Sequence, residues 1–191
     1  MKGFYSEGYK DTECLILKEM DTALSAVDPE AVERLVHEIL NADQVFFVGV
    51  GRVLLALQAI CKRLAHLGIK THYVGEITEP AITEKDLLIV GSGSGSTMFP
   101  LGIARIAKSR GAKIAHIGSN PNSPMKEYAD LMVRIPVRTK EYLEDEIDSA
   151  QPMTSLFEQS LLLFGDIIAK MIIEERQIDM KSLWRCHANL E

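Results

Sequence analysis

The residues with the clearest chemical potential form a run of glycines and hydroxyl side chains at 91–97, Gly-Ser-Gly-Ser-Gly-Ser-Thr. The run follows an apolar stretch at 87–90 and opens a segment with helical spacing. Glycines let backbone N–H groups turn inward as a nest for an anion, and a helix N-terminus adds partial positive charge. Hydroxyls supply donors for the free oxygens of a phosphate monoester. The run therefore predicts a phosphate site, with these candidate ligands: Ser92, Ser94, Gly95, Ser96 and Thr97.

A flexible glycine–serine turn is the competing interpretation of this run. Most strand-to-helix loops are shorter and less uniform, which favours a binding site. A P-loop is excluded because the chain contains no Gly-Lys-Ser/Thr. A second turn, Gly49-Val50-Gly51-Arg52, begins like a dinucleotide fingerprint, but Leu54 stands where the third glycine belongs. A nucleotide-binding oxidoreductase is therefore disfavoured, and a plain tight turn explains this segment equally well.

Glu158 is the candidate proton carrier. A single carboxylate can remove a proton from a carbon beside a carbonyl and return it to the next carbon through an enediol. Glu158 lies between Phe157 and a run of leucines, in a segment with few charges. The sequence Ser155-Leu156-Phe157-Glu158 also fits a capping box, in which the glutamate only bonds the helix start. Spacing alone favours the capping box.

Three further side chains are candidates for the same chemistry. His66 falls in the last turn of an expected helix, where complementing the helix dipole is the alternative role. His187 lies near the chain end, where an exposed, frayed position is the alternative. Arg52, directly after Gly51, is suited to pair with a phosphate or a sugar hydroxyl, or simply to be exposed. The other histidines, His37, His72 and His116, are interpreted as structural.

The elements that must position these residues follow an alternating pattern. Two helices are expected in the first forty residues, and the second is capped by Asp28 with Pro29 at its first position. Short apolar runs without polar alternation then predict buried strands at 45–48, 71–74, 87–90, 113–117 and 131–135. Helices are expected at 52–67 and 97–110, each closed by a glycine, and at 154–175. The acidic stretch 137–149 is expected to be a solvated loop or exposed helix.

This order of elements predicts an α/β protein with a parallel sheet and helices on both of its faces. In a flavodoxin-like sheet of strand order 2-1-3-4-5, strands one and three are neighbours whose chains leave in opposite directions. That divergence opens a crevice at their carboxyl ends, and both glycine turns would line it.

Composition excludes several classes of protein. The 191 residues are 47% hydrophobic and 25% charged, which is ordinary globular usage. A net charge of −6 disfavours nucleic acid as a partner, and no apolar run is long enough to span a membrane. Three widely separated cysteines indicate neither a disulfide framework nor a zinc site, so we expect a cytoplasmic protein without a metal. The N-terminus lacks the apolar core of a signal peptide.

The chain resembles the sugar isomerase (SIS) domain family, and within it the 6-phospho-3-hexuloisomerases. Five ordered segments carry this resemblance: VGVGR at 48–52, YVGEITEPAI at 73–82, GSGSGST at 91–97, QPMTSLFEQSLLLF at 151–164 and HANLE at 187–191. It implies one SIS domain over 1–191, with N-terminal helices at 5–40, a sheet core at 44–136, and a C-terminal helix and tail at 154–191. It also implies a three-layer α-β-α sandwich around a five-stranded parallel sheet.

The resemblance further implies an isomerase that interconverts a 3-hexulose 6-phosphate and fructose 6-phosphate, a step of formaldehyde fixation through ribulose monophosphate. No metal or organic cofactor is implied. A homotetramer is implied, and we expect its sites to be shared between subunits, with the C-terminal tail of one chain completing a neighbour's site. The family's presumed base falls on Glu158, which reverses the preference for a capping box. A family histidine before Leu-Gly falls on His66.

The sequence departs from the family at four positions. Val53 and Leu54 replace a Ser-Gly pair, Ser96 replaces a residue that is often charged, and Glu79 replaces a threonine before Pro80. Two bulky apolar groups near the phosphate are expected to restrict the pocket. These departures keep two alternatives open, an isomerase of a different phosphosugar and a non-catalytic sensor that binds a sugar phosphate.

Overall fold

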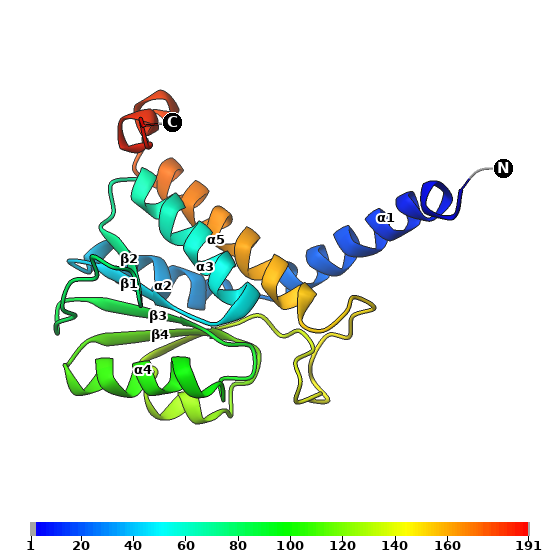
Figure 1. Cartoon of the computed structure of the whole chain (residues 1–191), viewed down its shortest axis with the longest axis horizontal. Helices are drawn as coiled ribbons and strands as arrows, with labels where there is room; N and C mark the ends of the chain where they lie inside the picture. The colour runs from blue at the N-terminus through cyan, green and yellow to red at the C-terminus, as the bar shows by residue number, and fades with distance from the viewer. Residues whose placement is uncertain (1–2, 191) are drawn as a thin grey trace.

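The computed structural model describes residues 3–190 and contains a five-stranded, all-parallel sheet in the order β2-β1-β3-β4-β5 (Figure 1). The predicted strand order and fold class are therefore confirmed. Residues 1, 2 and 191 lie outside the described range, so Glu191 of the HANLE segment has no structural account. The strands are β1 (Val45–Val48), β2 (Thr71–Tyr73), β3 (Leu87–Gly91), β4 (Lys113–Gly118) and β5 (Leu131–Arg134).

The central strands are buried on both faces, which explains their unbroken apolar sequences. Every residue of β1 and β3 is buried, and the two strands run in register, with Val45 opposite Leu87 and Val48 opposite Val90. β2 at the edge is only half-buried, and its last residue is Tyr73 rather than Val74. The backbone N–H of Val74 still donates to the Phe47 carbonyl at 2.9 Å, so the pairing continues one residue beyond the strand.

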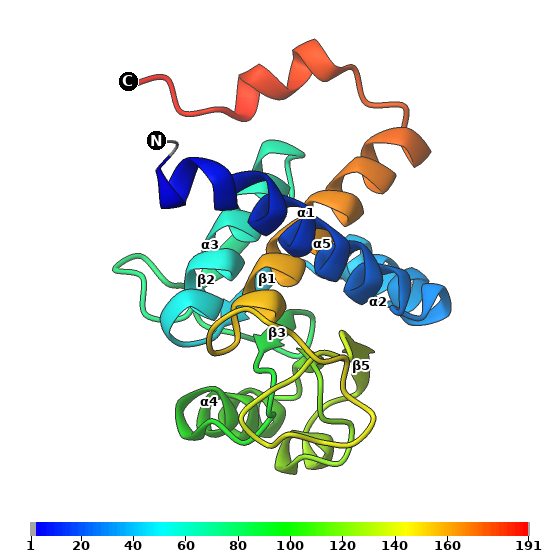
Figure 2. The ribbon, with the colours of Figure 1, turned by 90° about the vertical axis from the view of Figure 1, so that its right-hand side faces the viewer.

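Helices cover the sheet on both faces (Figures 1 and 2). α2 (Pro29–Asn41), α3 (Gly51–His66) and α5 (Ser155–Glu175) pack with part of α1 (Phe4–Ser25) over one face. α4 (Met98–Ser109) and the 3-10 turn η1 (Pro124–Glu127) cover the other. Two separate apolar clusters lie on either side of the sheet. The three-layer sandwich follows from strands that have apolar side chains on both faces.

The N-terminal helices form as their sequence predicts. The Asp28 carboxylate accepts a hydrogen bond from the Glu30 N–H at 3.0 Å, and Pro29 occupies the first helical position. α2 then buries Leu35 and Ile39 against the core. α1 runs outward from the body of the molecule, and its first half has no contact with the sheet (Figures 1 and 2). Its C-terminal half packs on α5 through residues that include the fully buried Ala23.

α3 and α5 lie unusually close, and Gly165 is the reason. A Cβ atom at this position would come within 2.2 Å of Ile60 on α3, so no larger residue fits without displacing one helix. This contact sets the two helices side by side and brings the start of α3 opposite the start of α5. Two of the candidate residues, Arg52 and Glu158, belong to these two first turns.

Three expectations about loops and ends need adjustment. Thr97 is the N-cap of α4 rather than its first residue, and α3 begins one residue earlier than expected, at Gly51. The acidic stretch 137–149 is a loop, but Val137 and Thr139 within it are buried, because a parallel bridge joins Val137 to Ile147. The tail contains the 3-10 segment η2 (Met180–Cys186). Within residues 3–190 no helix combines the length and apolarity needed to cross a bilayer.

Candidate active site

A cavity of about 420 Å³ opens at the carboxyl ends of β1 and β3, where the sequence predicted a crevice. α3 leaves β1 toward one face of the sheet and α4 leaves β3 toward the other, so the two chains diverge. A volume of this size falls within the roughly 300–1,000 Å³ typical of small-molecule sites. The lining residues are Val50, Gly51, Arg52, Val53, Gly91, Ser92, Gly93, Ser94, Thr97, Thr139, Lys140, Met153, Thr154, Phe157 and Glu158.

The Gly/Ser loop that follows β3 presents unused donors to this cavity. Ser94 Oγ accepts from Ser96 Oγ at 3.0 Å, and Thr97 Oγ1 accepts from Ser92 Oγ at 3.3 Å. The hydroxyl protons of Ser94 and Thr97 are therefore available to a ligand. The backbone N–H of Gly93 and that of Ser94 donate to no other residue within the described chain. Donors in this arrangement, at the start of α4, suit a phosphate dianion.

The loop is held in shape from below by β4 and the segment after it. His116 Nε2 donates to the Ser92 carbonyl at 2.9 Å, and the Ser119 N–H donates to the Gly93 carbonyl at 2.8 Å. Burial lowers the pKa of His116, so the ring is neutral, and its bond to a carbonyl requires the proton on Nε2. His116, which the sequence analysis interpreted as structural, thus holds the Gly/Ser loop in place.

Gly95 does not line the cavity, although the sequence predicted it as a ligand residue. Its φ of +62° is a left-handed conformation that glycine tolerates best, and a Cβ there would lie 2.0 Å from Ser123 Oγ. Its N–H is used inside the loop, where it bonds Ser92. Ser96 is also outside the lining, and its hydroxyl lies 3.5 Å from the Glu141 carboxylate. Both residues shape the loop from behind.

Glu158 lies at the cavity wall with two partners. Thr154 Oγ1 donates to its Oε1 at 2.9 Å, and Arg52 Nε donates to Oε2. The Glu158 side chain is only 11% exposed, whereas that of Arg52 is 65% exposed. The capping-box alternative is wrong in detail, because Thr154 is the N-cap of α5 and Ser155 Oγ donates to the Pro152 carbonyl instead. Glu158 is consequently free of the helix backbone and directed to the cavity.

The glycine turn after β1 lines the cavity only in part. Gly51 has a φ of +57° and lines the cavity together with Arg52 and Val53. Leu54 is absent from the lining within the described residues. The expected narrowing of the pocket therefore rests on Val53 alone. Gly91 leaves the space that Val53 occupies, because a Cβ at Gly91 would lie 2.9 Å from Val53 Cγ1.

Five of the lining residues escaped the sequence analysis: Thr139, Lys140, Met153, Thr154 and Phe157. Four of them come from the segments before α5, which have no regular periodicity to mark them, and Phe157 lies in the first turn of α5. The one signal was the position of Thr154 four residues before Glu158 on an expected helix, which places both side chains on one face. Thr139 is fixed by Glu146, whose carboxylate accepts from the Thr139 N–H at 3.0 Å and from its hydroxyl at 2.9 Å.

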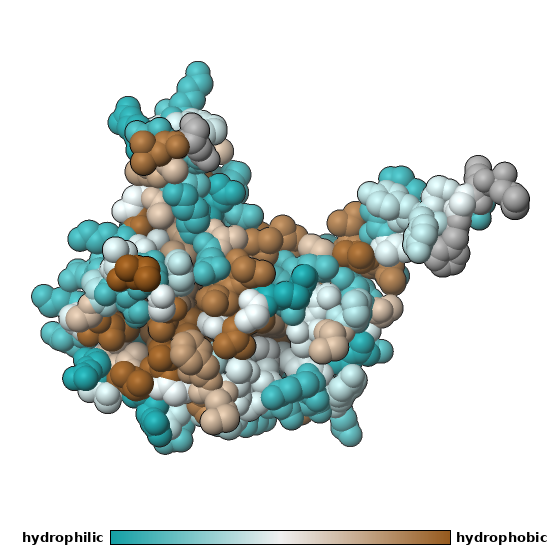
Figure 3. Space-filling model, in the orientation of Figure 1, coloured by the Kyte–Doolittle hydropathy of each residue, from teal (hydrophilic) through white to brown (hydrophobic). Residues whose placement is uncertain are grey.

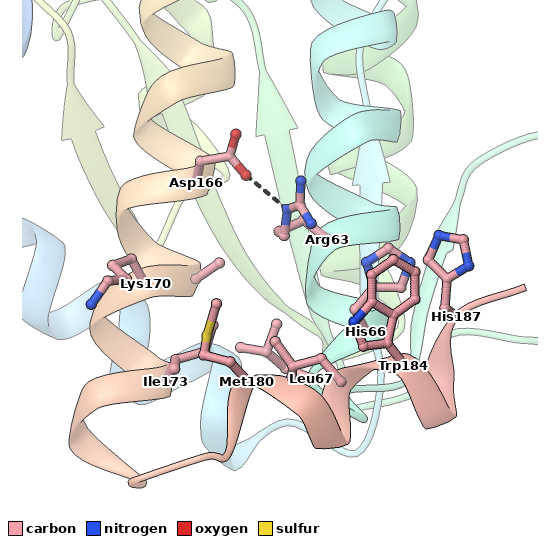
Figure 4. Close-up of a pocket in the computed structure, with 11 residues that line it drawn as sticks. Arg63, His66, Leu67, Asp166, Lys170, Ile173, Met180, Trp184 and His187 are labelled. Atoms are coloured by element: carbon pink, nitrogen blue, oxygen red, sulfur yellow. Dashed lines mark hydrogen bonds and ion pairs between the residues drawn. The ribbon is translucent and has the colours of Figure 1, made fainter.

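His66 and His187 are brought together, but far from Glu158 of the same chain. Their rings stack with centroids 5.1 Å apart, and Trp184 of η2 lies against His187 at the same separation. These side chains line a second pocket, of about 470 Å³, between the C-terminal ends of α3 and α5 and the tail (Figure 4). Arg52 and His66 are the second and last residues of α3, so helix geometry separates them by about 20 Å.

The environment of His66 suppresses its positive charge. Burial lowers the pKa of the imidazole, and the nearby charges of Lys62, His187 and Arg63 lower it further. Its Nε2 is buried without a hydrogen-bond partner. Arg63 is itself paired with Asp166 on α5 at 2.9 Å (Figure 4). A neutral imidazole is the form that can accept a proton. Across residues 3–190, no three His, Cys, Asp or Glu side chains are grouped so as to hold a metal ion.

The family of the chain follows from comparison with known proteins. The model of the SIS domain matches residues 38–164, which include all five strands and the whole cavity wall. The chain belongs to the SIS domain family. The match ends at residue 164, six residues after Glu158, so both glycine loops and Glu158 fall inside the SIS region.

Relatives within the SIS family cover nearly the full chain. A protein from Bacillus subtilis named 3-hexulose-6-phosphate isomerase is 38% identical over 92% of this chain and 95% of its own length. One of the same name from Mycobacterium gastri is 38% identical over 93% of this chain and 88% of its own length. A solved structure of a protein from Methanococcus jannaschii, for which the function of a 3-hexulose-6-phosphate isomerase has been inferred, is 30% identical to this chain. It superposes with a TM-score of 0.81 and covers 95% of this chain and 99% of its own.

Proposed function

We propose that this protein is a sugar-phosphate isomerase that interconverts a 3-hexulose 6-phosphate and fructose 6-phosphate. The observation that carries the proposal is that the Glu158 carboxylate and the Gly/Ser loop line the same cavity. Such a site could hold a sugar phosphate by its phosphate group and bring a base to its carbonyl carbons. The names of the two bacterial relatives agree with this chemistry.

The reaction is a proton transfer between neighbouring carbons. The phosphate is bound by the Ser94 and Thr97 hydroxyls and by the N–H groups of the loop, with Lys140 as a further cation on the wall. Glu158 takes the proton from C2 of the 3-hexulose, and the electron pair of that C–H bond forms the C2=C3 bond of an enediol as the C3 oxygen gains a proton. The C2 hydroxyl then loses its proton, and Glu158 returns a proton to C3.

The partners of Glu158 suit this role. Thr154 donates a hydrogen bond to one carboxylate oxygen of Glu158, and Arg52 donates to the other, so the carboxylate is held at the cavity wall. Because the Arg52 side chain is mostly exposed, it is able to turn from Glu158 to a substrate oxygen as the ligand enters. A guanidinium beside the reacting carbons would stabilise the negative charge that develops on the enediolate. No cofactor is part of this mechanism.

We further propose that each site is completed by a neighbouring subunit in a homotetramer. His66 and His187 lie too far from Glu158 of their own chain to touch the same sugar. Their stacking places both imidazoles at one end of the molecule, so a partner that presents this end would bring both at once. A neutral His66 would there assist ring opening or move a proton between sugar oxygens.

The proposal places the reaction in the cytoplasm, in the fixation of formaldehyde through ribulose monophosphate. The isomerisation would convert the first condensation product, a 3-hexulose 6-phosphate, into a form used by central carbohydrate metabolism. Its partners are then a small phosphosugar and copies of the same chain, without nucleic acid or membrane. Three separated cysteines, without a disulfide among the described residues, are consistent with a reducing compartment.

A coupled assay that consumes fructose 6-phosphate tests the proposal. The Glu158→Gln variant keeps the size of the side chain and an oxygen for the Thr154 hydroxyl, but cannot accept the proton. We expect turnover to fall by the ~10²–10⁴-fold usual for loss of a general base, with nearly unchanged thermal stability. Glu175→Gln, the same change at the exposed far end of α5, is the control and should keep full activity. Equal turnover in the Glu158→Gln variant would contradict the proposal.

A non-catalytic sensor of sugar phosphates is the second candidate. Val53 favours it, because an apolar side chain lines the cavity where the family presents a hydroxyl. Calorimetry together with a panel of hexulose and pentulose phosphates separates the candidates. Micromolar binding without turnover of any member would establish the sensor, and turnover of another phosphosugar would correct only the substrate.

A further inference from the structure

Glu19 of α1 makes several hydrogen bonds outside the cavity, to a segment 130 residues further along the chain. Its Oε2 accepts from Ser149 Oγ at 2.6 Å and from Gln151 Nε2 at 3.0 Å, and its Oε1 accepts from the Ala150 N–H at 2.8 Å. One carboxylate thus binds three consecutive residues through both of its oxygens. Ser149 and Gln151 are buried, so these bonds are shielded from water.

A second charge secures the same segment from the other side. The Arg138 guanidinium donates to the Ser149 carbonyl and to the Asp148 carboxylate. Burial by itself would raise the pKa of Glu19, but the bonds from Ser149, Ala150 and Gln151 and the charge of Arg138 outweigh it and hold that pKa below its usual value. Glu19 is therefore ionised at neutral pH, and it is not a group that titrates there.

The clamped residues lead directly into the wall of the cavity. Gln151 is followed by Pro152, whose carbonyl accepts from the Ser155 hydroxyl, and then by Met153 and Thr154, which line the cavity. Met153 has a φ of +55°, a left-handed conformation that costs free energy in a residue with a side chain and needs its surroundings to maintain it. Thr154 in turn donates to Glu158 at 2.9 Å.

Arg138 links the same segment to two further lining residues. It directly precedes Thr139 and Lys140, both of which line the cavity. Glu19 and Arg138 together thus hold the two segments that bring Thr154 and Lys140 to the site.

We propose that Glu19 is a positioning residue, whose clamp on residues 149–151 sets the place of Thr154 and thereby of the Glu158 carboxylate. Glu19 itself does not touch the cavity. This inference rests on the proposed function where it concerns catalysis, but the clamp itself is a structural statement that holds whichever sugar is bound. It also assigns a role to α1, whose N-terminal part projects away from the body of the molecule (Figure 1).

The test compares Glu19→Gln with Asp21→Asn in the full-length protein. Glu19→Gln keeps the shape of the side chain but replaces one carboxylate oxygen by an NH₂ group. That group is itself a donor, so it cannot accept a hydrogen bond from residues 149–151. Asp21→Asn removes the same charge from an exposed position two residues away. In Glu19→Gln we expect kcat to fall at least tenfold, with KM within about threefold because the phosphate loop is untouched. Asp21→Asn should match the unmodified protein in both constants.

Hydrogen exchange supplies a readout that does not depend on the reaction. In Glu19→Gln the amides of 149–158 should exchange at least tenfold faster, while those of 92–97 keep their rates. If the protein turns over no phosphosugar, the proposed function fails. The exchange pattern then still shows whether Glu19 holds residues 149–151 in place. Unchanged exchange across 149–158 would overturn the proposed clamp. So would an unaltered kcat per folded molecule with only a lower melting temperature, since that is the behaviour of a purely structural bond.

Discussion

Ser94 and Thr97 show at the scale of single residues how a hydroxyl is prepared for a ligand. Each oxygen already accepts a hydrogen bond, from Ser96 and Ser92 respectively, so each proton is left for the cavity. A phosphate oxygen accepts such protons better than water does, because the donors are preoriented and partly buried. At Glu158 the arrangement is the reverse, because both carboxylate oxygens accept hydrogen bonds, one from Thr154 and one from Arg52.

Replacing Ser94 and Thr97 together with alanine removes both donors. Each hydrogen bond contributes about 0.5–1.5 kcal/mol net, and more when the acceptor is charged, so affinity for fructose 6-phosphate should fall about 5- to 150-fold. Isothermal titration calorimetry measures this. Ser109→Ala is the control, because that hydroxyl bonds the Ile106 carbonyl at the far end of α4. Unchanged affinity in the double variant would show that the Gly/Ser loop does not bind the phosphate.

The Gly/Ser loop, at the scale of elements, depends on its neighbour β4. His116 on β4 donates to the loop backbone, and Gly118 leaves room for its ring, because a Cβ at Gly118 would lie 2.3 Å from the imidazole Nε2. The loop is therefore rigid because its carbonyls are bonded to an adjacent strand. A buried neutral histidine in this place also makes the stability of the element depend on pH.

Stability should decrease as the pH falls below about 6.5. In that range the unfolded chain protonates His116, whereas burial lowers the pKa of the folded group and keeps it neutral. Stability is thus complete above the unfolded pKa and is lost on acidification, by at most ~1.4 kcal/mol per pH unit for one group. His66 acts in the same direction. Urea titrations between pH 7.5 and 5.5 measure the effect.

The variant that isolates this contribution is His116→Gln, which retains an N–H donor for the Ser92 carbonyl but does not titrate. Its stability should decline less steeply with acidification than that of the unmodified protein. His37→Gln, at an exposed position of α2, should leave the slope unchanged. Parallel pH profiles for the His116→Gln variant and the unmodified protein would contradict the assignment.

The whole molecule has an apolar surface that its own chain does not cover. α5 buries one face in the core and also leaves four large apolar side chains exposed, namely Leu162, Leu163, Ile167 and Met171. Figure 3 shows apolar residues gathered on the side of the molecule where α3 and α5 lie. Contiguous apolar patches on a protein surface mark contacts with other proteins. Association of several copies would enclose this helix.

Mixing two inactive variants tests whether the sites are shared. Glu158→Gln damages one half of a proposed shared site and His187→Ala the other half. After subunit exchange, some sites would contain neither change, so the mixture should regain part of the activity. Mass spectrometry of the mixed assemblies confirms that exchange has occurred, and each variant exchanged with itself is the control. A mixture without activity after proven exchange, or full activity of His187→Ala alone, would refute sharing.

Local patterns in the sequence determined the architecture of this protein. Unbroken aliphatic runs specified the strands, glycines and Asp28 marked helix ends, and the Gly/Ser run marked the loop between β3 and α4. These features were predictable because each depends on residues within a few positions of one another. Several boundaries of strands and helices, among them those at Gly51, Tyr73 and Thr97, differed from the prediction by a single residue.

The tertiary structure alone decided how the candidate residues are combined. Arg52 and Glu158 are 106 positions apart, and they meet because Gly165 lets α5 lie close to α3. Glu19 reaches Ser149 across a similar distance in the chain, and the resemblance of the tail to other sequences did not reveal that His187 stacks on His66. Such pairs leave no periodic trace, because a polar side chain selects its partner by position in the packed molecule and not by spacing along the chain.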